Sequence, residues 1–393
     1  MKVPFYGHTR QYHNVQKDID ANIQKVLESG EYVHGPMNKQ FEKEFAEFSG
    51  TKYSIPCGNG TDALWLTLMA MGIGKGDEVI TNANTFFATA EAIWIAGATA
   101  VLVDCCPKTK TICPDRIEKA ITPQTRCIIP VHLYGQCADM PRIRKIADQH
   151  GLKVLEDNAQ AIDAAGDTFK IGELSDAVAT SFIIQKNLGC FGDGGAIVTN
   201  DEQINRVTKL LRAHGSPARN VHSFGFNSRL DDIQAGVLSV KLKHIHEWNN
   251  LRIRWAKRYT EGLKNVTCVD LPYAKPGYRH VWHLYVIETK RPQDRDAMLK
   301  WLNEQGVDAK THYSIAIHQQ EGYPWGKDAR IVGPLTNAEA NAACCISLPM
   351  FPELTEQEVD YTIQKVLEWE KLHPECCSTA PGAARAGICC EDK

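Results

Sequence analysis

One lysine occupies a position where its amine could act as a nucleophile. Lys186 lies in SFIIQKNLGCFGDGGAIVTND, residues 181–201, which reads as strand, glycine-rich turn and strand and contains no other lysine or arginine. An amine in an apolar setting loses its proton more readily than in water and can then attack a carbonyl group. Ser181 adds a hydroxyl at the start of the segment. The alternative is a surface lysine without a chemical role, and the rest of the sequence decides between the two.

The segment GNGTDAL, residues 58–64, contains Gly60 and Thr61 and reads as a glycine turn opening onto a helix, with Thr61 as the expected cap. The unpaired N–H groups at a helix start and the positive end of the helix dipole favour an anion such as phosphate. The segment matches neither the GxxxxGK[ST] phosphate loop nor the GxGxxG dinucleotide motif. Taken alone, it is equally well explained as an ordinary helix start.

Two further segments supply an aromatic ring and a carboxylate. In NTFFATA, residues 84–90, Phe86 or Phe87 either joins the core or offers a flat face to a ring. In LEDNAQA, residues 155–161, Asp157 follows an apolar run that reads as a strand. Ligands of α/β enzymes bind at the carboxyl ends of parallel strands. The alternative for Asp157 is a solvated helix cap.

An anion cradle, an aromatic plate, a carboxylate and a lysine together match the needs of pyridoxal 5′-phosphate (PLP). Its phosphate takes a helix N-terminus and hydroxyl groups, its pyridine nitrogen takes a carboxylate, and its aldehyde forms a Schiff base with a lysine. The four segments therefore predict a PLP site centred on Lys186.

The elements that would position these residues alternate between short strands and helices. Strands are expected at residues 78–83, 99–104, 127–135, 153–159, 177–182 and 195–200, which are short, rich in β-branched residues and bounded by Gly, Asp, Asn or Pro. Helical patterns lie between them, and one of these ends at Gly151. Such alternation predicts an α/β sheet with mostly parallel strands. From about residue 203 a long helical run leads to a smaller αβ unit.

The chain has 393 residues, so two domains are expected, at residues 1–245 and 246–375. A net charge of −3 gives no general reason to bind nucleic acid or an anionic membrane. No apolar stretch approaches the ~20 residues needed to cross a bilayer, and the polar N-terminal segment lacks a signal-peptide pattern, so a cytoplasmic location is expected. The Cys-rich tail, residues 376–393, is expected to be disordered, with soft-metal binding as the alternative.

The sequence resembles the DegT/DnrJ/EryC1/StrS family of PLP-dependent sugar aminotransferases, a branch of the fold-type-I aminotransferases. The resemblance covers residues 3–370 and includes, in order, LESGEYVHGP, GNGTDAL, NTFFATAEAI, PVHLYGQCADM, LEDNAQA, FGFNSRLDDIQAGVL, HVWHLYVI and SLPMFPELT. It implies a large domain with a mostly parallel seven-stranded sheet flanked by helices, and a smaller C-terminal α+β domain.

The resemblance also implies roles for single residues. Lys186 would form the internal aldimine and move the proton in a ping-pong reaction that passes through pyridoxamine 5′-phosphate (PMP). Asp157 would hold the ring nitrogen of the cofactor, Gln160 its 3-hydroxyl and Phe86 its ring face. Its phosphate would be held by Gly60, Thr61 and Ser181. Asn227 matches an asparagine that reaches the phosphate from the neighbouring subunit. This implies a homodimer with shared active sites, and Arg229 would lie near the same entrance.

The sequence departs from the family pattern beside the lysine. Ile183 stands where the family usually has His or Tyr, which leaves transamination intact but puts the sugar in question. The substrates considered are a nucleotide-linked keto-hexose and an oxidised eight-carbon sugar acid of lipopolysaccharide (8-amino-Kdo formation), with L-glutamate as the expected amino donor. His312, Tyr313 and His318 are candidates for the sugar side, with ordinary loop or packing roles as the alternative. His280 and His283 are interpreted as structural, and no residues have convincing metal-ligand spacing.

Two rival functions remain at this point. A PMP-dependent sugar dehydratase shares the fold, but that branch has a histidine in place of the lysine. A regulatory or scaffold protein could keep the fold without activity, because fold does not fix function. The intact set Asp157, Gln160, Ser181 and Lys186 favours the aminotransferase over both.

Overall fold

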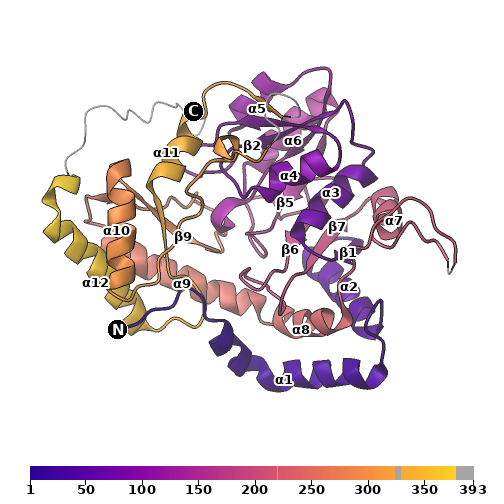
Figure 1. Cartoon of the computed structure of the whole chain (residues 1–393), viewed down its shortest axis with the longest axis horizontal. Helices are drawn as coiled ribbons and strands as arrows, with labels where there is room; N and C mark the ends of the chain where they lie inside the picture. Colours follow the sequence, from indigo (N-terminus) through magenta and orange to yellow (C-terminus); the bar gives the residue numbers. More distant parts are fainter. Residues whose placement is uncertain (219, 324–328, 378–393) are drawn as a thin grey trace.

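The computed structural model describes residues 1–218, 220–323 and 329–377. The chain begins with two helices, α1 (His8–Ser29) and α2 (Pro36–Ser49), which pack against α8 (Asp232–Leu242). Figure 1 shows α1 beneath α8, at the edge of the molecule. Neither helix was among the elements expected from the sequence.

The large sheet has the order β1-β7-β6-β5-β4-β2-β3-β10. Its strands are β1 (Tyr53–Cys57), β2 (Glu78–Asn82), β3 (Thr99–Val103), β4 (Thr125–Ile129), β5 (Lys153–Asp157), β6 (Ala177–Ser181), β7 (Gly195–Thr199) and β10 (Ala329–Ile331). The pairings from β6 through to β10 are parallel, and those of β7 with β6 and β1 are antiparallel. The mostly parallel α/β fold is confirmed. The expected count of seven strands is wrong by one, because β10 reaches over from the C-terminal part of the chain.

Helices cover both faces of this sheet (Figure 1). They are α3 (Gly60–Ala70), α4 (Ala88–Ile95), α5 (Pro114–Ala120), α6 (Met140–His150) and α7 (Glu202–Leu211). The apolar core follows the two faces as separate clusters, one beneath α3 and α4 and the other beneath α5 and α6. Helix α6 ends at Gly151 with φ 65°, as its sequence predicts.

Two local expectations were wrong. Helix α3 is capped by Asn59, whose side chain accepts a hydrogen bond from the Asp62 N–H at 2.8 Å, and not by Thr61. The stretch after β4 does not continue as a strand but turns through η1 (Leu133–Gly135), where Tyr134 has φ 61°. This turn brings Tyr134 beside the residues at the end of β5.

The smaller unit begins with the long α9 (Ile245–Leu263). Its antiparallel sheet has the order β11-β9-β8, with β8 (Val269–Asp270), β9 (Tyr285–Thr289) and β11 (Cys345–Leu348). The remaining elements are α10 (Pro292–Glu304), η2 (Ile317–Gln319), α11 (Thr336–Cys344), α12 (Glu356–Leu372) and η3 (Pro374–Cys377). Cys376, the first residue of the expected disordered tail, is instead buried in the core of this unit, and residues 378–393 lie outside the described residues. No helix in the described residues has the length and apolar character to cross a bilayer.

Candidate active site

Lys186 lies in the tight loop after β6. The loop is closed by hydrogen bonds from the Lys186 N–H to the Ile183 carbonyl (2.8 Å) and from the Ile184 N–H to the Gly192 carbonyl (3.1 Å). No hydrogen bond or ion pair joins the Lys186 ammonium to another residue within the described ranges. Burial lowers the pKa of Lys186 to about 8, and the nearby Asp157 carboxylate opposes part of this effect. This amine therefore gives up its proton closer to neutral pH than an ordinary lysine does.

Asp157 ends β5 and is buried, with 5% of its surface exposed. Its two carboxylate oxygens accept hydrogen bonds from the Ala159 N–H (3.1 Å) and the Thr89 hydroxyl (2.9 Å). Burial raises the pKa of Asp157, while these two hydrogen bonds and the charges of Lys186 and His132 lower it. The structure thus places a held carboxylate near the lysine.

The anion cradle forms where α3 begins against β6. A Cβ atom added to Gly60 would lie 2.6 Å from the Ser181 Cβ, so only glycine allows this approach of helix and strand. The Asn59 side chain caps the Asp62 N–H, which leaves the N–H groups of Gly60 and Thr61 at the helix start without an intrahelical acceptor. Backbone donors and the Ser181 hydroxyl therefore meet at one place, as a phosphate site requires.

Phe86 and Gln160 complete the predicted cofactor-binding residues. Phe86 is 54% exposed, which is unusual for a phenylalanine in the middle of a domain, and its ring centroid lies 5.4 Å from that of Tyr313. The Gln160 side chain accepts from the Tyr134 N–H (2.7 Å) and donates to the Tyr313 hydroxyl (3.1 Å). Phe86 therefore offers an exposed ring, whereas the buried Gln160 is held in place at both of its polar atoms.

The candidates for the sugar side are distributed unevenly. Tyr313 contacts Gln160 and Phe86 directly, and burial raises its pKa. His312 is hydrogen bonded to Ser347 (2.9 Å), and burial together with the charges of Lys186 and Lys310 lowers its pKa to about 4. His312 is therefore a neutral imidazole near the lysine at physiological pH.

The two remaining candidates for the sugar side are His318 and Ile183. The His318 Nε2 lies 2.9 Å from Glu339 on α11, an interaction outside the site residues described above. Ile183 is partly exposed in the lysine loop, where its carbonyl accepts from the Lys186 N–H. The structure leaves the sugar-side roles of His318 and Ile183 as predictions.

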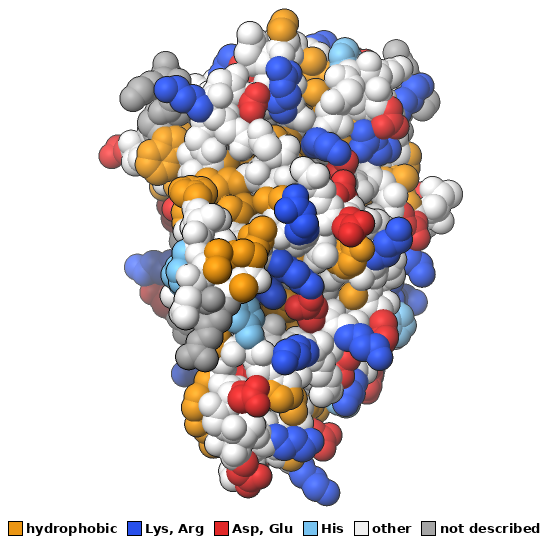
Figure 2. All heavy atoms as spheres, turned by 90° about the vertical axis from the view of Figure 1, so that its right-hand side faces the viewer, with side chains coloured by type: hydrophobic (Ala, Val, Ile, Leu, Met, Phe, Trp, Pro, Cys, Tyr) orange, Lys and Arg blue, Asp and Glu red, His pale blue; other side chains and the backbone are white. Residues whose placement is uncertain are grey.

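Asn227 and Arg229 lie in the segment that follows α7. The Asn227 backbone pairs with Ala213 and its side chain is exposed, while Arg229 is partly exposed and its charge helps to lower the pKa of His34. No contact in the described residues joins either side chain to Lys186 or Asp157 of the same chain. Val221 and Phe224 in this segment are 51% and 73% exposed. Figure 2, which looks onto this side of the molecule, shows apolar side chains among mixed charges.

Three residues near the site were not predicted from the sequence. Tyr134 holds Gln160 through its N–H and donates its hydroxyl to the His312 carbonyl at 2.5 Å. Thr89, near the start of α4, holds Asp157, and its hydroxyl lies 3.3 Å from that of Thr85 in the turn before the helix. His283, interpreted as structural, is hydrogen bonded to Asn187 at 3.0 Å, and burial with the charge of Lys186 lowers its pKa.

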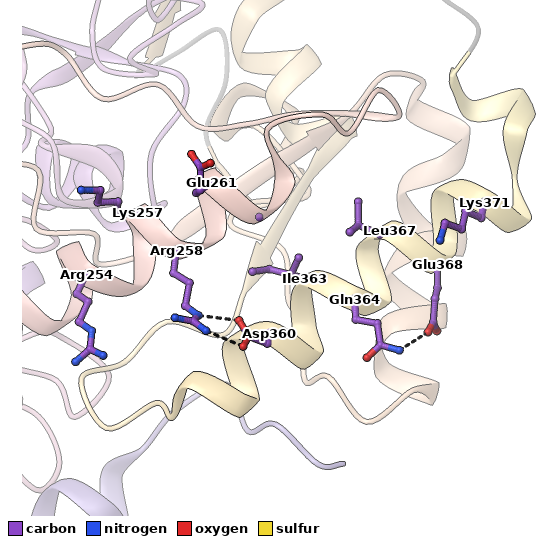
Figure 3. A pocket seen from close by; sticks show the side chains of 11 residues that line it. Arg254, Lys257, Arg258, Glu261, Asp360, Ile363, Gln364, Leu367, Glu368 and Lys371 are labelled. Atoms are coloured by element: carbon purple, nitrogen blue, oxygen red, sulfur yellow. Dashed lines mark hydrogen bonds and ion pairs between the residues drawn. The ribbon is translucent and has the colours of Figure 1, made fainter.

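A separate hollow of about 770 Å³ lies between α9 and α12, in the smaller unit (Figure 3). Its charged side chains are largely engaged with neighbours: Arg258 forms two 2.7 Å contacts with Asp360, and Gln364 binds Glu368. In the described residues, no group of His, Cys, Asp or Glu is arranged to hold a metal ion. The described residues that are suited to catalysis therefore lie around Lys186.

Comparisons with known proteins match nearly the whole chain. A model of the DegT/DnrJ/EryC1/StrS aminotransferase family matches residues 13–367. Over 94% of its length the chain is 42% identical to a pleiotropic regulatory protein of Geobacillus stearothermophilus, covering 99% of that protein. It is 41% identical over 94% of its length to the dTDP-3-amino-3,4,6-trideoxy-alpha-D-glucose transaminase of Streptomyces venezuelae, covering 96% of that protein.

A third relative and a solved structure extend the pattern. Over 91% of its length the chain is 40% identical to the UDP-N-acetyl-3-dehydro-alpha-D-glucosamine 3-aminotransferase of Acidithiobacillus ferrooxidans. The match covers 95% of that protein. The crystal structure of S. venezuelae DesV in complex with a ketimine intermediate superposes with a TM-score of 0.90 at 41% identity, covering 94% of this chain and 98% of that one. The similarity spans both the large sheet and the smaller unit.

Proposed function

Because the chain belongs to the DegT/DnrJ/EryC1/StrS aminotransferase family, we propose that it moves an amino group from L-glutamate to carbon 3 of a nucleotide-linked keto-hexose. The chain is a PLP-dependent sugar aminotransferase. The observation that carries the transfer of an amino group is the Lys186 amine, with its lowered pKa, near the buried carboxylate of Asp157.

The residues present fit PLP. The cradle of Gly60, Thr61 and Ser181 would take the phosphate, because an added Cβ at Gly60 would fill it. The Asp157 carboxylate would take the pyridine nitrogen, and the exposed ring of Phe86 would lie against the cofactor ring. Gln160, already fixed by Tyr134, would contact the 3-hydroxyl.

When bound, PLP supplies an electrophilic aldehyde and a ring that withdraws electrons from the carbon that exchanges its proton. The uncharged Lys186 Nζ would be the nucleophile available to such an aldehyde, and the same amine could take and return a proton as general base and acid. Its lowered pKa places both forms within reach near neutral pH. The Asp157 carboxylate, held by Thr89 and Ala159, would offer its negative charge to the ring nitrogen, and this charge would favour the protonated ring.

Carbon 3 and the nucleotide are supported by the names of relatives. The S. venezuelae and A. ferrooxidans proteins are named for dTDP- and UDP-linked sugars with the amine or oxo group at position 3. A Bacillus subtilis relative, 35% identical over 92% of the chain, is named 3-oxo-glucose-6-phosphate:glutamate aminotransferase, which supports glutamate as donor. The second candidate substrate is an oxidised eight-carbon sugar acid for lipopolysaccharide, favoured by the apolar Ile183 beside the lysine.

We further propose a homodimer in which Asn227 of one subunit completes the phosphate site of the other. The exposed Asn227, together with exposed Val221 and Phe224 in the same segment, supports this arrangement. A cytoplasmic location is part of the proposal.

The rival functions make different demands on the site. A PMP-dependent dehydratase needs a residue other than lysine at position 186, and Lys186 argues against it. A regulatory role has the support of a relative's name, the pleiotropic regulatory protein. A regulatory protein would have no need for a lysine of lowered pKa, so Lys186 favours the aminotransferase over a regulator.

The test is a spectrum of the purified protein with PLP, before and after addition of L-glutamate. We expect a visible absorbance band that glutamate bleaches and that a 3-keto nucleotide-linked hexose then restores. Lys186→Ala should show neither change, and Lys257→Ala, an exposed lysine on α9, should behave as wild type. A band that glutamate leaves unchanged would overturn the donor, and restoration only by an eight-carbon keto acid would overturn the hexose.

A further inference from the structure

The carboxylate of Asp157 is held from the start of α4. The Thr89 Oγ1 donates to Asp157 Oδ2 at 2.9 Å, and both groups are buried, with 1% and 5% of their surfaces exposed. The Thr85 Oγ1 lies 3.3 Å from the Thr89 Oγ1. An ionised carboxylate can only accept, so the Thr89 hydroxyl gives its proton to Asp157 and accepts from Thr85.

The same helix start also carries the aromatic plate. Phe86 lies between Thr85 and Thr89, and the Thr89 N–H donates to the Phe86 carbonyl at 3.3 Å. The positions of Phe86 and of the Asp157 carboxylate are therefore set by one turn of backbone. The titratable groups whose charges interact with Asp157 in the described residues are Lys186, from the loop after β6, His132, from the turn after β4, and Tyr313.

We propose that Thr89 is a positioning residue that fixes the Asp157 carboxylate, in its ionised form, for the pyridine nitrogen of PLP. The inference rests on the proposed function, in which Asp157 takes that nitrogen. The other Asp157 oxygen is held by the Ala159 N–H, so among the described residues Thr89 provides the one side-chain hydrogen bond that can orient the carboxylate. A hydrogen bond to a charged group in a buried site is among the stronger ones.

Loss of the Thr89 hydroxyl makes two changes at once. The carboxylate gains rotational freedom, and it loses a donor that favours its charged form, so a proton shared with the ring nitrogen moves towards Asp157. A less protonated ring withdraws fewer electrons, which raises the pH at which the visible band of the bound cofactor titrates. A threonine that serves only to pack α4 would change stability and leave this titration alone.

The experiment compares wild type with Thr89→Val, Thr89→Ser and the control Thr67→Val. Thr67 is a buried helical threonine whose hydroxyl binds the Ala63 carbonyl at 2.6 Å, away from Asp157. The readouts are the dissociation constant of PLP from the apo-protein, the pH midpoint of the visible band and the melting temperature. For Thr89→Val we expect about tenfold weaker PLP binding and an upward shift of the midpoint, with both restored in Thr89→Ser and unchanged in Thr67→Val.

Thr85→Val keeps the proposal testable if Thr89→Val does not fold, because it removes only the donor to Thr89. It should shift the midpoint in the same direction by a smaller amount. Unaltered PLP affinity and midpoint in Thr89→Val, or in Thr85→Val if that alone folds, would overturn the role of Thr89 while the proposed function stands. A wild-type protein that shows no visible band with PLP would overturn both.

Discussion

At the scale of single residues, the site lowers the stability of the fold when its cofactor is absent. Lys186 has no ion-pair partner within the described residues, and burial disfavours its charged form. A group whose folded-state pKa lies below its unfolded value of about 10.5 destabilises the fold wherever it is charged. The folded apo-protein therefore tolerates a cation that it would be more stable without, as expected where a residue is kept for reactivity.

The first prediction follows from this cost. Apo Lys186→Met should be more stable than the apo wild type at pH 7 by about 1–2 kcal/mol, a value reduced for the partial exposure of Lys186. The wild type should gain stability as pH rises from about 8 towards 10.5, because the unfolded chain then binds the extra proton. The advantage of the variant should thus vanish above about pH 10. Thermal unfolding across this pH range measures it, with exposed Lys257→Met as the control that should show no such trend.

The second prediction concerns Tyr313. Because its hydroxyl accepts from Gln160, Tyr313→Phe should weaken PLP binding about threefold to tenfold, corresponding to one lost hydrogen bond. The KM for the sugar should change less than the affinity for PLP. Tyr259→Phe, which removes a buried hydroxyl bound to the Pro349 carbonyl in the smaller unit, is the matched control. A larger effect on the KM for the sugar than on the affinity for PLP would indicate that Tyr313 binds the sugar.

At the scale of elements, the close contact of α3 with β6 depends on one glycine. Gly60→Ala places a Cβ 2.6 Å from that of Ser181, so the helix start must move away from the strand. We expect at least about tenfold weaker PLP binding and a loss of about 1–3 kcal/mol in stability, typical of overpacking. Gly236→Ala on α8, where the nearest atom would be 3.5 Å away, should be neutral or stabilising. Equal PLP affinity in the two variants would argue against the cradle.

The sequence was informative where a local pattern determines an element. Six strands of the large sheet and the Gly151 helix end were predicted, because apolar runs and a left-handed glycine leave clear local signals. β1 was missed because YSIPC is short and contains a proline, and β10 because three residues have no pattern of their own. Within the site, Lys186 and Asp157 stand out in the sequence, whereas Tyr134 does not. The role of Tyr134 depends on its backbone φ of 61° and on a hydrogen bond to Gln160, 26 residues further along the chain. Residue spacing in the sequence predicts neither feature.

At the scale of the whole molecule, the proposed shared site predicts complementation between inactive chains. Lys186→Ala lacks the reactive amine, and Asn227→Ala lacks the group offered to the other subunit. A mixed dimer would have one site with both residues intact, so random reassortment of equal amounts should restore about a quarter of wild-type activity. Turnover after unfolding and refolding the two variants together measures this, with each variant refolded alone as baseline. Activity no higher than the sum of the two baselines would show that Asn227 acts within its own chain or not at all.

The smaller unit is joined to the large sheet by more than its connecting chain. β10 extends the sheet in register with β3, and Arg330 on β10 makes two contacts, of 2.9 and 2.8 Å, with Glu78 on β2. The start of α11 is held by Asp104, whose carboxylate accepts from the Asn337 and Ala338 N–H groups at 3.0 Å. These links fix residues of one unit onto the edge of the other.

Such links bear on how a bulky sugar reaches the amine. Swinging the two units apart about a hinge would break the β10 ladder and uncap α11, exposing unpaired backbone groups that are costly to leave unsatisfied. We expect no large domain closure in the catalytic cycle, in contrast with enzymes that enclose their substrate by rigid-body motion. The sugar then enters and leaves through a path that stays open throughout the cycle, helped by movement of the side chains around it. The scattering profile in solution should accordingly stay the same with and without substrate.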